Sequence, residues 1–150
     1  MHSRSGMSFW FVTVLVLALP GMSWSQEPSD EKPFADVHVV LQLSDQEKEA
    51  VVLDVANNLI KYYGGPDFVD IEIVTFGAGV RLLFEDGKYQ SRIASLVDNG
   101  IRFYICENTL DTMERKTGVR PKVNPVALPV QAGVAKLVDS VAEGFILVKP

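Results

Sequence analysis

From about residue 36 onward, short apolar runs typical of strands alternate with longer stretches in which apolar residues recur at helical spacing. The spacing predicts helices following Ser44, over Tyr89–Asp98, from Asn108 or Thr109 to Arg115, and over Gln131–Glu143. The predicted strands are Val37–Leu43, Val69–Phe76, Ile101–Ile105, Val126–Leu128 and Phe145–Val148. The predicted order is therefore β-α-β-α-β-α-β-α-β.

The first predicted helix carries start and stop signals in the sequence. Ser44 and Glu47, three positions apart, match a capping box, in which each side chain bonds a free backbone N–H of the first turn. Apolar residues then follow at helical spacing as far as Tyr63. Gly64-Gly65-Pro66 ends the pattern, as expected at a helix C-terminus.

Strict alternation of mostly apolar strands with helices predicts an α/β fold. We expect a three-layer α/β/α arrangement with a five-stranded, mostly parallel sheet, similar to flavodoxin in general layout. In such sheets, ligands bind beyond the carboxyl ends of the strands. The segments expected at that edge are Ser44-Asp45, Gly77–Arg81 and Cys106–Thr109.

The N-terminal residues have the pattern of a secretory signal peptide. Arg4 precedes an apolar run of 11 residues, Phe9–Leu19, and Ser23 and Ser25 supply small residues before a cleavage point after Ser25. The run is shorter than the roughly 20 residues that a transmembrane helix needs, although an uncleaved anchor is the alternative. We therefore expect a signal peptide (1–25), a flexible leader (26–35) and one domain (36–150) in a periplasmic or secreted protein without stable membrane insertion after cleavage.

Composition narrows the chemistry. The 150-residue chain has a net charge of −5, which becomes −6 after cleavage because Arg4 is the only charged residue removed. An acidic protein is not expected to bind nucleic acid as its main partner. A single Cys excludes an intramolecular disulfide and a Cys-based zinc site. No cofactor or metal motif is present, so neither group is predicted.

Cys106 is the candidate catalytic residue. It follows the third predicted strand and precedes a helix, where the positive end of the helix dipole favours an anion and hence a nucleophilic thiolate. Glu107 opposes this effect through its like charge. The alternative is a small structural Cys in the core. His38 remains the only His after cleavage and lies early in the first strand, so a Cys–His hydrolase pair is not expected.

Other residues at the same edge are candidates for binding an anion or substrate. Asn108 and Thr109 stand at the helix start beside Cys106. Gly77-Ala78-Gly79 begins like a dinucleotide-binding loop, but Leu82 occupies the place of the third glycine, which favours a tight exit turn. Arg81 could contact an anion, although a solvated side chain is the alternative. The candidates are thus Cys106 for catalysis and Asn108, Thr109, Gly77, Gly79 and Arg81 for binding, with no metal ligand.

Two blocks of sequence resemble the DsrE/DsrF-like family. They are Gly100–Leu110 (GIRFYICENTL) and the tail formed by Ala132–Leu137 (AGVAKL) and Glu143–Pro150 (EGFILVKP). The resemblance covers about residues 36–150. It implies a five-stranded parallel α/β/α fold, homo-oligomers such as trimers or hexamers, and relay of sulfur as a persulfide on one Cys after a central strand, a position that Cys106 matches. The relay members act in the cytoplasm with partner subunits, whereas this chain carries an export signal, so transfer-RNA thiolation is not expected.

Two functional hypotheses follow. The first is a periplasmic sulfur-relay or sulfurtransferase-like protein that carries sulfane sulfur on Cys106 and works without a cofactor. Its partners would be a small sulfur compound and a sulfur donor or acceptor protein. The alternative is a non-catalytic oligomeric module that binds a small anion or metabolite, with Cys106 in a structural role.

Overall fold

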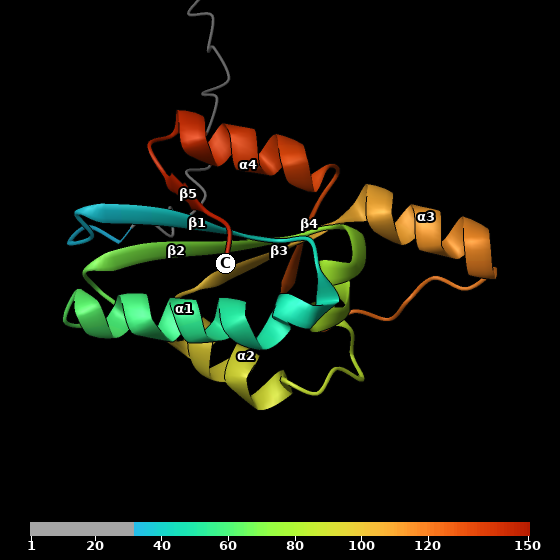
Figure 1. The fold of residues 1–150 in the computed structure, drawn as a ribbon, viewed down its shortest axis with the longest axis horizontal. Helices are drawn as coiled ribbons and strands as arrows, with labels where there is room; N and C mark the ends of the chain where they lie inside the picture. The colour runs from blue at the N-terminus through green and yellow to red at the C-terminus, as the bar shows by residue number, and fades with distance from the viewer. Residues whose placement is uncertain (1–31) are drawn as a thin grey trace, which may run out of the picture.

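The computed structural model describes residues 32–150, which form one five-stranded parallel sheet between helices (Figure 1). The predicted signal peptide and most of the predicted leader lie outside the described residues. The strand order is β4-β3-β2-β1-β5, and each neighbouring pair is parallel. The strands are β1 (Val37–Leu43), β2 (Val69–Thr75), β3 (Arg102–Cys106), β4 (Ala127–Val130) and β5 (Ile146–Val148). The predicted α/β fold is confirmed.

The helices cover the two faces of the sheet unequally. Figure 1 shows α1 and α2 against one face, α4 alone against the other, and α3 extending beyond the carboxyl edge. The helices are α1 (Glu49–Tyr62), α2 (Gln90–Asp98), α3 (Glu107–Thr117) and α4 (Gly133–Ala142), with 3-10 segments η1 (Gln46–Lys48) and η2 (Gly77–Leu83). Among the described residues, no helix has both the length and the apolar character required to cross a membrane.

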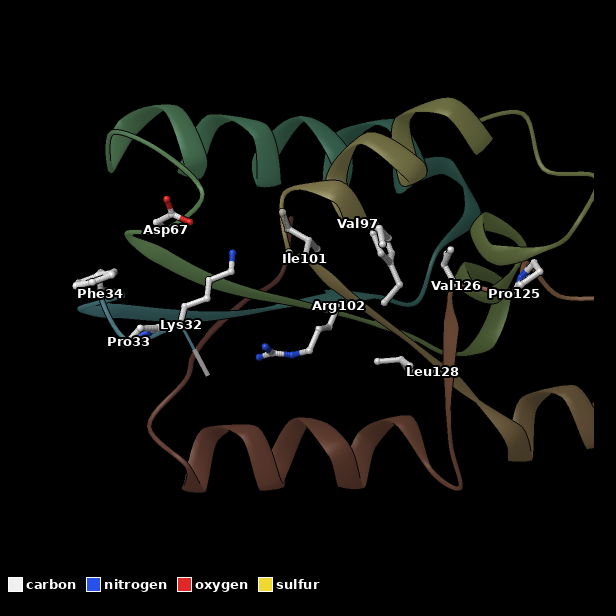
Figure 2. A pocket seen from close by; sticks show the side chains of 12 residues that line it. Lys32, Pro33, Phe34, Asp67, Val97, Ile101, Arg102, Pro125, Val126 and Leu128 are labelled. Atoms are coloured by element: carbon white, nitrogen blue, oxygen red, sulfur yellow. The ribbon is translucent and has the colours of Figure 1, made fainter. Parts of the chain in front are cut away.

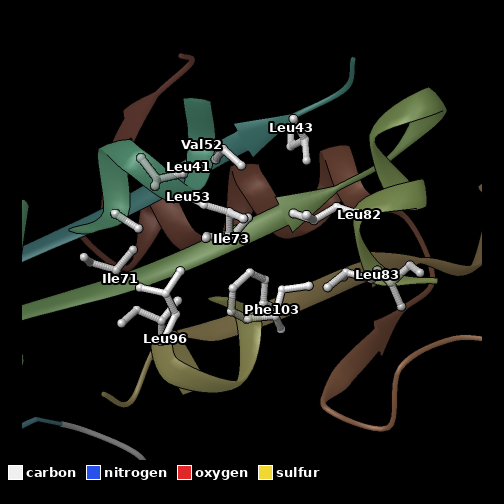
Figure 3. Packing of buried hydrophobic residues seen from close by; sticks show 14 of the residues in the cluster. Leu41, Leu43, Val52, Leu53, Ile71, Ile73, Leu82, Leu83, Leu96 and Phe103 are labelled. Atoms are coloured by element: carbon white, nitrogen blue, oxygen red, sulfur yellow. The ribbon is translucent and has the colours of Figure 1, made fainter. Parts of the chain in front are cut away.

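The face toward α1 and α2 holds the main hydrophobic core. Alternate residues of each strand point to this side, as the two-residue period of a strand requires. Phe103 of β3 is fully buried at its centre and is surrounded by aliphatic side chains from β1, β2, η2 and both helices (Figure 3). Burial of apolar surface therefore accounts for the attachment of α1 and α2.

The face toward α4 is held largely by polar contacts. Glu72 of β2 is buried, and its carboxylate accepts hydrogen bonds from Lys136 Nζ at 2.8 Å and from Ser140 Oγ at 2.6 Å, both on α4. Arg102 Nη2 lies 3.2 Å and the Tyr104 hydroxyl 3.4 Å from Oε1 of the same carboxylate. A buried carboxylate is tolerated only when it is paired and hydrogen-bonded, so this network fixes α4 on the sheet.

Burial and charge act on the pKa values of this network. Burial raises the pKa of Tyr104, and the negative charge of Glu72 raises it further. For Arg102, burial lowers the pKa, but the hydrogen bond to Asp70 and the charges of Asp70 and Glu72 outweigh this effect and raise it. Both side chains therefore donate hydrogen bonds to Glu72 across the ordinary pH range.

Two helix starts differ from the sequence prediction. The Ser44–Glu47 capping box is wrong: Ser44 Oγ donates to Asp45 Oδ2, a 3-10 turn follows, and α1 begins only at Glu49. The cap predicted at Asn108 or Thr109 is also wrong, because α3 begins at Glu107 with Cys106 as its N-cap. In both cases a polar side chain makes another hydrogen bond instead of capping the helix.

We predict that Lys136→Met weakens the attachment of α4. The substitution keeps the length of the side chain but removes the ammonium group that Glu72 contacts. The free energy of unfolding should fall by about 1.5–3 kcal/mol, the value of a charged hydrogen bond, in urea denaturation. Lys149→Met, at an exposed position after β5, serves as the control and should change it by less than about 0.5 kcal/mol. Equal effects of the two variants would contradict the role of the network.

Candidate functional site

The carboxyl ends of β3 and β4 mark the point at which the order of strand addition changes. Strands β2, β3 and β4 are added outward from β1 on one side, and β5 is then added on the other side of β1. The connections from β1 through β4 add strands successively on one side, whereas β4 is followed by α4, which crosses the opposite face to reach β5. Connections that leave neighbouring strands on opposite faces open a crevice at the carboxyl edge, where ligands of open α/β sheets bind. Cys106 lies at this point, paired in register with Val130.

Cys106 is held between β3 and the start of α4. It is the last residue of β3, its side chain is buried with 5% of the residue exposed, and Sγ lies 3.9 Å from the carbonyl oxygen of Gln131. Gly133 begins α4 beside it. A Cβ at Gly133 would lie 3.1 Å from Phe76 Cβ and 3.4 Å from Cys106 Cβ, so the glycine allows the helix to approach closely.

Two helix N-termini converge on Cys106. It is the N-cap of α3, and Gln131 directly precedes Ala132, the N-cap of α4. Neither N-cap makes a side-chain hydrogen bond to its first turn. The two helix dipoles favour an anion at this position. The Gln131 carbonyl oxygen acts in the opposite direction, because it accepts a hydrogen bond from the neutral Cys106 thiol.

Glu107 opposes this potential less than the sequence suggests. Its carboxylate pairs with Arg120, whose guanidinium also contacts Asp111 at 2.6 Å and Glu114 at 3.2 Å. These hydrogen bonds, together with the nearby charges, raise the pKa of Arg120. Arg120 offsets only part of the negative charge next to Cys106, because its one positive charge is shared among three carboxylates.

Asn108 and Thr109 connect the start of α3 to the neighbouring loops. Asn108 donates its backbone N–H to the Gln131 carbonyl at 3.1 Å, and its Oδ1 accepts from Gln131 Nε2 at 2.7 Å. Thr109 Oγ1 accepts from the backbone N–H of Gly77 at 3.2 Å. These contacts bring three of the predicted residues, Asn108, Thr109 and Gly77, around the junction of β3 and α3 at which Cys106 lies.

Gly79 allows η2 to pack against the end of β1. Its N–H donates to the carbonyl oxygens of Ser44 and Phe76, both at 3.1 Å. A Cβ at Gly79 would lie only 2.4 Å from the carbonyl oxygen of Leu43. The Gly-Ala-Gly segment therefore makes the close approach that the tight-turn interpretation expects.

Arg81 lies in a different hollow of the same edge. Its guanidinium stands 5.9 Å from the centre of the Phe84 ring, and the residues around the hollow include Glu49 and Lys88 but not Cys106. The members of this grouping come from α1, η2 and the loop before α2, so no local spacing in the sequence indicated it.

His38 is at the opposite edge. It lies at the amino end of β1, with Nδ1 3.4 Å from Asp70 Oδ2 and its ring 5.2 Å from that of Phe145. Cys106, by contrast, is the last residue of β3. In the part of the chain that the structure describes, no three His, Cys, Asp or Glu side chains are grouped to hold a metal ion.

A cavity of about 750 Å³ opens at the amino ends of β3 and β4 (Figure 2). Its wall is mainly apolar and includes two cationic side chains, Lys32 and Arg102. Lys32 Nζ donates to the carbonyl oxygens of Pro66 (2.7 Å), Asn99 (3.0 Å) and Val69 (3.3 Å). Burial lowers the pKa of Lys32. Both cations already bond groups of the protein, and Asp67 adds a carboxylate to the wall.

Comparisons with known proteins bear on the fold. No protein-family model matches the chain, and no curated protein is significantly similar to it. A solved structure, the protein of unknown function MTH1491 from Methanobacterium thermoautotrophicum, is similar with a TM-score of 0.68 and 25% sequence identity. The match covers 77% of this chain and 100% of that protein. The same α/β fold therefore occurs in a second protein.

We predict that Gly79→Ala destabilises the carboxyl edge, because the added methyl group would collide with the backbone of β1. The free energy of unfolding should fall by about 1–3 kcal/mol, as for other overpacked sites, in urea denaturation. Ala78→Ser, at the exposed neighbouring position, is the control and should change it by less than about 0.5 kcal/mol. A Gly79→Ala variant as stable as the control would show that the close approach is not required.

Proposed function

We propose that the protein is an exported sulfur-relay or sulfurtransferase-like protein that carries sulfane sulfur as a persulfide on Cys106. The observation that carries the proposal is the position of Cys106 Sγ between two helix N-termini without side-chain caps. A negatively charged sulfur gains stabilisation there from the dipoles of the two helices. The resemblance to the DsrE/DsrF-like family, in which a Cys after a central strand carries sulfur, supports the same function.

The chemistry needs one thiol and no cofactor. The Cys106 thiolate attacks the sulfane sulfur of a donor such as thiosulfate, a new S–S bond forms, and the donor S–S bond breaks with its electron pair leaving on sulfite. The products are the Cys106 persulfide anion and sulfite, so atoms and charge balance. An acceptor thiolate then attacks the terminal sulfur and releases the Cys106 thiolate. The acceptor would be a small thiol or a partner protein.

Burial of Cys106 favours a second candidate. With 5% of the residue exposed and Sγ near the Gln131 carbonyl, Cys106 could serve as a packed core residue, as free Cys often does. The protein would then be a non-catalytic module that binds a small anion or metabolite at the same edge. In that case Cys106 reacts slowly while the protein is folded.

We further infer that the protein forms homo-oligomers through α4 and β5. Val134, Ala135, Val138, Val141 and Ala142 occupy the exposed side of α4, and at 100° per residue they form an apolar stripe roughly 120° wide. Such a stripe is as wide as the core-facing side of an ordinary helix. The adjacent edge strand β5 exposes Ile146 and Leu147. A second copy of the chain has the same apolar stripe on α4 and the same open edge at β5. The two copies can therefore contact each other through identical surfaces, as symmetric association requires.

Persulfide formation is predicted on Cys106 alone. Reduced full-length protein incubated with thiosulfate or polysulfide should gain the mass of one sulfur atom, measured by intact-protein mass spectrometry and reversed by a thiol reductant. Cys106→Ser is the matched control and should gain none, because the chain contains no other Cys.

The same sample separates the two candidate functions. The relay predicts that iodoacetamide labels native Cys106 readily near neutral pH. The binding module predicts slow labelling of the folded protein, rapid labelling in urea and no gain of sulfur. A sulfur gain that persists in Cys106→Ser would refute the relay.

We predict that Val138→Glu dissociates the oligomer by placing a charge at the centre of the α4 stripe. Light scattering coupled to size exclusion should show wild type as an oligomer and the variant as a monomer. Val119→Glu, an exposed apolar position after α3, is the control and should leave the mass unchanged. A monomeric wild-type protein would contradict self-association and leave α4 to a different partner.

A further inference from the structure

The hollow beside Arg81 is a second polar site at the carboxyl edge. It has a volume of about 470 Å³, within the range of small-molecule sites. Its walls come from η1 and the start of α1 on one side, and from η2 and the following loop on the other. The chemically distinctive residues are Glu49, Arg81 and Lys88, with Glu47 and Asp86 also contributing carboxylates.

Glu49 is a buried residue that lines this hollow. The residue is 6% exposed, and its Oε1 atom bonds no group among the residues that the structure describes. Nearly all buried polar atoms in folded proteins have a hydrogen-bond partner, so a buried carboxylate oxygen without a hydrogen bond requires an explanation. Burial raises the pKa of Glu49, while the positive charges of Lys88 and Arg81 act in the opposite direction.

The two cations are held in place but carry no salt bridge. Arg81 lies over the Phe84 ring at 5.9 Å, and Lys88 Nζ lies over the Tyr89 ring at 4.7 Å. Within residues 32–150, neither side chain takes part in an ion pair closer than 4.0 Å. Their charges are therefore available to an anionic group that enters the hollow.

We propose that the hollow binds a small zwitterion of the amino-acid class. The ammonium group of the ligand donates a hydrogen bond to the Glu49 carboxylate, and the carboxylate of the ligand is held by Arg81 and Lys88. A simple anion would give Glu49 no hydrogen bond and would be repelled by its negative charge. A simple cation would be repelled by the positive charges of Arg81 and Lys88. A ligand with both charges complements Glu49 as well as Arg81 and Lys88. This proposal does not depend on the chemistry of Cys106.

Calorimetric titration of the full-length protein with each standard amino acid tests the proposal. At least one amino acid should bind, and acetate and methylamine, which carry the two charged groups separately, should bind at least about tenfold more weakly. Binding of acetate as tight as that of any amino acid would overturn the zwitterion assignment. Failure of every amino acid to bind would do the same.

Substitutions then assign the contacts. Glu49→Gln should weaken binding about tenfold or more, while the melting temperature without ligand stays at or above that of wild type because a buried unpaired charge is removed. Arg81→Gln should also weaken binding. Glu85→Gln, an exposed carboxylate of the neighbouring loop that does not line the hollow, is the matched control. Unchanged affinity in Glu49→Gln would refute the proposal.

Discussion

The ion network of Glu72 is the interaction on which the arrangement of this protein depends. On the α1 and α2 face, aliphatic and aromatic side chains hold the layers together. On the opposite face, the buried apolar contribution is limited to Val40, Val74 and Leu137 with a few partly buried neighbours. Lys136 and Ser140 must therefore reach Glu72 to hold α4. A charged contact of this kind defines one position of the helix more sharply than apolar packing does, because each hydrogen bond is directional.

The position of α4 in turn determines the environment of Cys106. The helix starts at Gly133, whose missing side chain allows close contact with Phe76 and Cys106. If α4 shifted along the sheet, its N-terminus would no longer lie beside the thiol. The same helix directs the Lys136 contact inward and all three of its valines outward, which reverses the usual pattern of a surface helix. This reversal is the physical basis of the self-association that we propose for α4.

The sequence predicted the strands and the helix ends better than the helix starts and the sites. Strands were visible because β-branched and aliphatic residues are concentrated in short runs, and Gly64-Gly65-Pro66 marked the end of α1. Ser44 led to a wrong prediction of the start of α1, because its hydroxyl bonds the side chain of the adjacent Asp45 instead of a backbone N–H of the helix. The Glu72–Lys136 contact joins residues 64 positions apart, and the Glu49 hollow joins three separate segments, so no local spacing revealed them. Asp70 and Glu72, acidic residues on one face of a central strand, were the available signal of a polar network.

The distribution of satisfied and unsatisfied polar groups distinguishes the two edges of the sheet. At the amino edge, Lys32 bonds three carbonyl oxygens, and Arg102 bonds Asp70 and Glu72. Asp70 Oδ1 has no hydrogen-bond partner within residues 32–150, but Oδ2 of the same carboxylate is bonded by Arg102 and lies near His38. At the carboxyl edge, two helix N-termini have no side-chain cap, and Glu49, whose Oε1 has no hydrogen-bond partner among the described residues, lines a hollow. Unsatisfied groups reduce stability, and proteins retain them mainly where a ligand or reactant completes the bonding. For this reason the carboxyl edge, rather than the larger apolar cavity at the amino edge, is where we place both the sulfur chemistry and the zwitterion site.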